Sequence, residues 1–77
     1  MTIIRLNDSE AATSLLAHLH AQQDVWVDRI DDERLRASLF GSYSAEAMHL
    51  ELHLRVRAWE AAERARGRAV ALEFEDV

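Results

Sequence analysis

The chain of 77 residues contains no cysteine and no lysine, and these two absences remove several classes of chemistry. Without cysteine there is no disulfide, no thiolate nucleophile and no cysteine-ligated zinc or iron–sulfur site. Without lysine there is no lysine Schiff base, no P-loop lysine and no lysine general base. All nine basic residues are arginines, so few reaction types stay open to this chain.

Glycine and long apolar runs are also scarce. Gly41 and Gly67 are the only glycines, and no phosphate-cradling loop or nucleophile elbow surrounds them. No uninterrupted apolar run approaches the ~20 residues of a membrane-spanning helix, and the first residues do not read as a secretory signal. We therefore expect a cytoplasmic protein that is not an enzyme, has no membrane segment and binds no cofactor.

The length and the charge narrow the choice of partner. A chain of this size supports one hydrophobic core, so residues 1–77 should form a single domain, and 49% hydrophobic residues are enough to fold it in water. The net charge is −5, and the arginines are mostly interleaved with glutamates. An acidic total opposes binding to a polyanion, so nucleic acid is an unfavoured partner, although Trp26 and Phe40 could stack bases on an open sheet face.

Four segments have the composition or the apolar–polar alternation typical of β-strands. They are residues 2–6, 25–30, 35–40 and 69–75. Segment 35–40 is ambiguous, because Leu35, Leu39 and Phe40 also fit a short helix; we favour the strand. It would form a hairpin with segment 25–30 across a charged turn at residues 31–33.

Two segments have helical character. In residues 9–22 apolar residues recur at the spacing of one helical face, and Asn7 with Glu10 three positions later fits a capping box. Residues 45–66 are less simple, because leucines alternate there as in a strand. Helix-forming residues, Ser44 as an N-cap and Gly67 as a left-handed C-terminal residue favour a helix.

The predicted order is therefore β-α-β-β-α-β, a small two-layer α+β domain. This is the split βαβ pattern of ferredoxin-like folds, with both helices on one face of an antiparallel sheet. The fold by itself does not indicate a function, since many unrelated activities use it.

His49 and His53 are the weak candidates for a metal site. They lie four residues apart on one helical face, a spacing that can chelate a divalent metal, but a zincin motif needs a glutamate where Leu50 stands. Projected on a helix, both histidines fall in one polar arc that we expect to be solvated. The arc contains Glu46, His49, His53, Arg57, Glu60 and Arg64.

The same projection gives the long helix two apolar stripes, where a helix lying on a sheet needs one. The first contains Met48, Leu52, Val56 and Trp59, and the second contains Ala47, Leu50, Leu54, Ala58, Ala61 and Ala65. The second stripe either packs against the first helix or forms a surface for a partner or for a second copy of the chain. We predict protein–protein association, favouring a homodimer, with Leu50, Leu54, Arg55, Ala58 and Ala61 as the contact residues.

An uncapped strand at the edge of the sheet offers a second route to association, because it can pair with the same edge of another copy. A different class of function is a small-ligand or metal-binding domain. It would use the open sheet face near Trp26 and Phe40, or the pair formed by His49 and His53.

Overall fold

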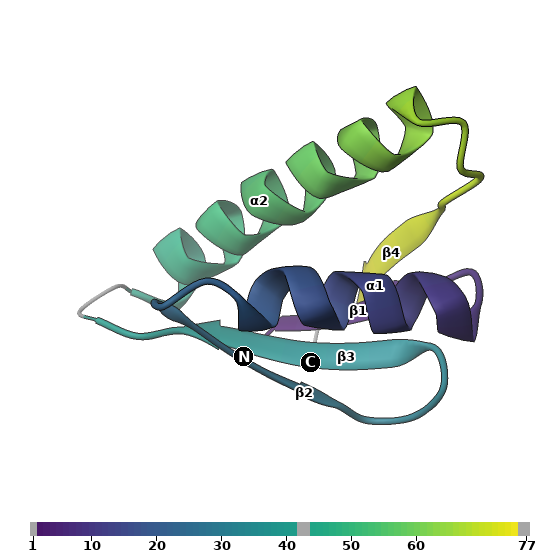
Figure 1. The fold of residues 1–77 in the computed structure, drawn as a ribbon. Helices are drawn as coiled ribbons and strands as arrows, with labels where there is room; N and C mark the ends of the chain where they lie inside the picture. The colour runs from purple at the N-terminus through teal and green to yellow at the C-terminus, as the bar shows by residue number, and fades with distance from the viewer. Residues whose placement is uncertain (1, 42–43, 76–77) are drawn as a thin grey trace.

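The computed structural model describes residues 2–41 and 44–75, which form a sheet with both helices on one of its faces (Figure 1). The elements in chain order are β1 (Thr2–Leu6), α1 (Ser9–His20), β2 (Val25–Arg29), β3 (Arg34–Leu39), α2 (Ala45–Ala65) and β4 (Leu72–Glu75). The fold is thus a small α+β domain with the β-α-β-β-α-β order of ferredoxin-like folds. The ambiguous segment 35–40 is a strand, and the segment with alternating leucines is a helix, both as predicted.

The four strands lie in the order β2-β3-β1-β4, and every pair is antiparallel. In the centre of the sheet Ile4 of β1 stands opposite Leu35 of β3 and Phe74 of β4. Because successive side chains of a strand point to opposite faces, this register directs the apolar side chains of three strands toward the helices. The alternate side chains point to the open face, and they include the apolar Ile3 and Trp26 as well as arginines such as Arg36.

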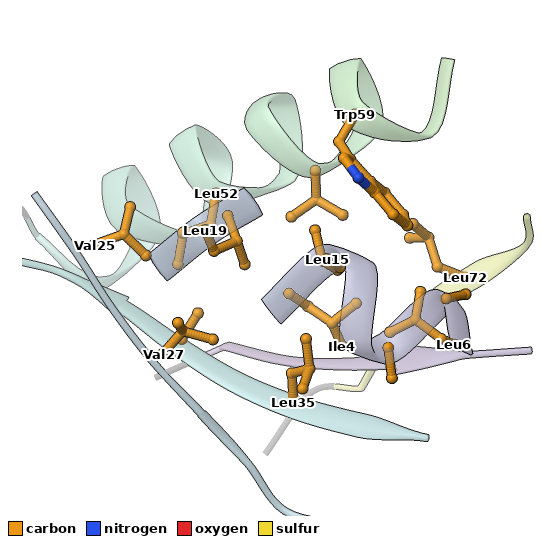
Figure 2. Close-up of a cluster of buried hydrophobic side chains, with 14 of the residues drawn as sticks. Ile4, Leu6, Leu15, Leu19, Val25, Val27, Leu35, Leu52, Trp59 and Leu72 are labelled. Atoms are coloured by element: carbon orange, nitrogen blue, oxygen red, sulfur yellow. The ribbon is translucent and has the colours of Figure 1, made fainter. Parts of the chain in front are cut away.

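The hydrophobic core lies between the sheet and the two helices, as Figure 2 shows. Ile4, Leu15 and Leu35 meet at its centre and have no exposed surface. Trp59 of α2 reaches down toward Leu72 of β4, so one large side chain fills the space under the C-terminal half of the helix (Figure 2). The core therefore takes only the inward residues of each helix.

Helix α1 begins at Ser9, as predicted, but its N-cap differs from the prediction. Its N-cap is Asp8, whose carboxylate accepts a 2.7 Å hydrogen bond from the Ala11 N–H, so the capping box at Asn7 is wrong. The Asn7 side chain instead joins the segment before β4, since its amide donates to the Ala69 carbonyl at 3.0 Å and accepts from the Ala71 N–H at 3.2 Å. Tertiary contacts thus replace the local cap that the sequence suggests.

Helix α2 has the ends that the sequence predicts. The Ser44 hydroxyl accepts a hydrogen bond from the Ala47 N–H at 3.2 Å, and Gly67 after the helix has a φ of 84°, in the left-handed region. A side chain at position 67 would be strained in that conformation. Glu51 and Arg55, four residues apart on the helix, form an ion pair at 3.2 Å. The same local signals therefore fix both ends and part of the surface of α2.

Candidate protein-interaction surface

The inward side of α2 is the first apolar stripe of the prediction. Leu52, Val56 and Trp59 are buried, and Met48 is half-buried against the same core. These side chains attach the helix to the sheet. The burial that a helix on a sheet requires is thus supplied by one stripe alone.

The other apolar stripe of α2 points away from the sheet, and we call it the outer stripe. Leu50 and Leu54 have 63% and 60% of their surface exposed. All six members of the outer stripe are exposed: Ala47, Leu50, Leu54, Ala58, Ala61 and Ala65. Packing of this stripe against the first helix, one of the two sequence alternatives, is therefore wrong. The four apolar residues predicted to contact a partner all lie on this exposed surface.

A polar contact occupies the side of α2 that faces α1. The Arg55 guanidinium donates to the Asp24 carboxylate at 2.7 and 2.8 Å and to the Gln22 side chain at 2.9 Å. These charge-assisted bonds raise the pKa of Arg55, and the Arg55 hydrogen bond lowers the pKa of the Asp24 carboxyl. Arg55, predicted as a contact residue, is thus bound to Asp24 and Gln22 of its own chain, and it lies beside the outer stripe.

The two histidines of the polar arc lie over the sheet, so the prediction that this arc is solvated is wrong for them. His49 Nδ1 is hydrogen-bonded to the buried Thr2 hydroxyl, and the His53 ring stacks on Phe74 with centroids 3.6 Å apart. Among residues 2–41 and 44–75, no group of three potential metal-ligating side chains is formed. The half-buried imidazoles therefore join α2 to β1 and β4.

Two glutamates near the end of α2 are buried, which the sequence reading did not anticipate. Glu60 lies between Arg57 at 3.0 Å and Arg64 at 3.3 Å. Glu63 lies between Arg66 at 3.6 Å and Arg68 at 3.3 Å. The signal available in the sequence was the arginine three or four positions after each glutamate. Burial became possible because each carboxylate has two guanidinium partners.

The open face of the sheet carries both aromatics named as possible ligand contacts. Trp26 on β2 is 37% exposed, and Phe40, just after β3, is 59% exposed. Arg36 lies 5.8 Å from the Trp26 ring centre and forms an ion pair with Asp28 at 2.6 Å. Its positive charge is thus balanced locally, which makes this face a poor platform for a nucleic-acid backbone.

Comparison of the chain with protein-family models, with curated proteins and with solved structures gives no match. Within the described part of the chain, neither helix combines the length and the apolar character needed to cross a membrane.

Proposed function

We propose that this chain is a small protein-binding domain of the regulatory, adaptor or inhibitor type, and that its binding surface is the outer stripe of α2. The observation that carries the proposal is the exposure of Leu50 and Leu54, one turn apart on a helix whose inward stripe already supplies the core. Removing apolar surface from water is favourable by roughly 25 cal/mol per Å². A continuous apolar line on a helix is thus a binding surface of the helix-to-helix kind.

The contacts beside the outer stripe support this choice over a small-ligand or metal site. His49 and His53, the metal candidates, contact Thr2 and Phe74. On the open sheet face the exposed Trp26 lies next to an ion-paired arginine. The outer stripe, in contrast, has large apolar side chains directed into water and no charged residue among its six members.

The experiment compares the native chain with a Leu50→Glu/Leu54→Glu double variant. The readouts are the sedimentation coefficient over a range of concentrations and the set of proteins that the immobilised chain retains from an extract of its native cells. We expect the double variant to lose self-association, retained proteins or both, because two carboxylates would have to be buried at the contact.

Phe40→Glu is the matched control, since Phe40 is equally exposed but lies outside α2. Circular dichroism of all three proteins verifies that each is folded. If the double variant sediments and retains proteins like the native chain, the outer stripe is not the binding surface and the proposal fails.

A further inference from the structure

We infer that the occupant of the outer stripe is a second copy of this chain, bound through antiparallel pairing of the two α2 helices about a twofold axis near residues 55–57. This inference rests on the proposed function and names its partner. Three features of the stripe carry it: its straight course, its distribution of large and small side chains, and the charges beside it.

The outer stripe runs straight along the helix. From Ala47 to Ala65 is eighteen residues, about five turns at 3.6 residues per turn, so the first and last members lie on one line parallel to the helix axis. At 1.5 Å per residue this line is about 27 Å long. A stripe that does not wind around its helix suits a second straight helix along its whole length.

The side chains of the outer stripe differ in size between its two halves. The leucines, Leu50 and Leu54, lie in the N-terminal half, and Ala58, Ala61 and Ala65 lie in the C-terminal half. Antiparallel pairing places the large half of each copy against the small half of the other. Side chains of one helix then fill the space left by alanines on the other at an even interaxial distance of 8–10 Å.

The register of that pairing follows from the twofold axis. Leu54 of one copy comes opposite Ala58 of the other, and Leu50 comes opposite Ala61. A parallel pair would place leucines against leucines at one end and alanines against alanines at the other. The helices would then be forced apart at one end and leave a gap at the other, which loses packing contacts.

Charges beside the outer stripe favour the same direction. Glu46 and Arg64 flank it on one side, and both are exposed. Arg64 contacts Glu60 at 3.3 Å and donates to the Val70 carbonyl at 3.2 Å, yet 60% of its side chain stays in solvent, where a second carboxylate can reach it. A twofold axis across the helices brings this flank of one copy beside the same flank of the other. Antiparallel pairing therefore brings Glu46 of each copy near Arg64 of the other, whereas parallel pairing would place both residues beside the opposite flank of the second helix, away from each other.

Arg57, close to the proposed axis, is the residue that could oppose the pairing, since two copies of it would approach each other. Its guanidinium is held by Glu60 at 3.0 Å and lies 5.2 Å from the Phe74 ring centre, on the sheet side of α2. The charge is thus neutralised locally and directed away from the second copy.

The whole arrangement leaves the rest of each domain outside the contact. The outer stripe points away from the sheet, and in Figure 1 α2 rises from the sheet toward its C-terminal end. The two sheets would therefore lie on opposite sides of the paired helices. A contact about 27 Å long and one helix wide belongs to the small interface class, so we expect a reversible dimer that forms at micromolar concentrations.

Disulfide trapping tests the direction of the pairing, because the native chain has no cysteine to interfere. Ala47→Cys and Ala65→Cys variants are made separately, tagged differently, mixed and oxidised mildly. Antiparallel pairing predicts that the mixed disulfide between the two variants predominates over the two self-disulfides. Predominance of the self-disulfides, or no trapping above the level of a Phe40→Cys control, overturns the inference.

Sedimentation of the untagged native chain separates failure of this inference from failure of the proposed function. A dimer that Leu54→Glu abolishes and Phe40→Glu preserves agrees with the inference. A native chain that stays monomeric at concentrations on the order of 1 mM overturns it. If that monomer still retains a different protein through Leu50 and Leu54, the proposed function survives; if it retains none, both fail.

A charge-reversal series examines the flanking contact. Glu46→Arg should weaken the dimer severalfold because it would meet Arg64 of the other copy, and adding Arg64→Gln should recover most of the loss by removing that repulsion without placing a carboxylate beside the buried Glu60. Failure of the double variant to recover would contradict the antiparallel register.

Discussion

Helices α1 and α2 lie on the same face of the sheet (Figure 1), yet they expose different kinds of side chain to solvent. Helix α1 buries Leu15 and Leu19 and presents polar residues such as Thr13 and His18 to solvent. Helix α2 buries its inward stripe and presents leucines and alanines. The apolar residues of the two helices thus differ in place: on α1 all the leucines are buried or half-buried, whereas on α2 Leu50 and Leu54 stay exposed on the surface that we propose for association.

The largest expected difference between the helices comes from the same truncation made on each. Leu15→Ala should lower the free energy of unfolding by about 2–5 kcal/mol, because Leu15 is fully buried and a cavity would be left behind. Leu50→Ala should change it by less than about 0.5 kcal/mol, since Leu50 is 63% exposed. Urea unfolding followed by tryptophan fluorescence measures both.

The difference between these two truncations should depend on the protein concentration. In dilute, monomeric protein the two truncations should differ as stated, whereas in concentrated protein Leu50→Ala should become more costly because the outer stripe is then covered. Equal losses for the two variants in dilute protein would mean that Leu50 is buried within one chain, and the contrast between the helices would not hold.

The starts of the two helices should differ by a smaller amount. Asp8→Ala should cost about 1–2 kcal/mol and Ser44→Ala about 0.5–1 kcal/mol. The Asp8 bond to Ala11 is shorter, 2.7 Å against 3.2 Å, and a carboxylate interacts favourably with the positive end of a helix. Thermal unfolding measures both. Glu10→Ala is the control, because the capping box that the structure lacks would make it costly as well.

The smallest effect concerns the contact that joins the α1 side of the domain to α2. Arg55 lowers the pKa of Asp24, so this contact stabilises the fold above the ordinary aspartate pKa of about 3.9 and loses its effect as the pH falls through the lowered pKa. Arg55→Met should therefore lower the free energy of unfolding at pH 7. The variant should also lose less of this free energy than the native chain when the pH is lowered.

Urea unfolding between pH 7 and pH 3 measures this difference, with Arg36→Met as the matched control. Arg36 lowers the pKa of Asp28 in the same way, but on the open sheet face rather than between helices. An NMR titration in which the Asp24 carboxyl has the same pKa with and without the Arg55 side chain would contradict the role given to this contact.

Most of the fold was predictable from the sequence because its signals are local. The alternation of apolar and polar residues predicted the strand that contains Leu35 and Leu39. Helix-forming residues, a cap at Ser44 and a glycine at position 67 identified α2 despite its alternating leucines. Asp8 was missed because it and Asn7 are both good caps. The choice between them was made by Asn7, which is bound to the distant segment before β4.

The candidate surface was only half predictable. The sequence indicated two apolar stripes on α2 but left open whether the second was buried. His49 and His53 were expected in solvent and instead cover Thr2 and Phe74. A helical projection gives the angles between residues, but it contains no information on how the helix is rotated and tilted over its sheet.

The sequence by itself therefore determined the elements, their order and the division of α2 into apolar and polar faces, because these depend on neighbours a few positions apart. Only the tertiary structure decided which face meets the sheet, which glutamates are buried beside arginines, and which leucines remain in water. The physical reason is that a buried residue is defined by contacts between segments distant in the chain. Here Leu52, Val56 and Trp59 pack against the core, and Leu50 and Leu54 on the other side of α2 point outward.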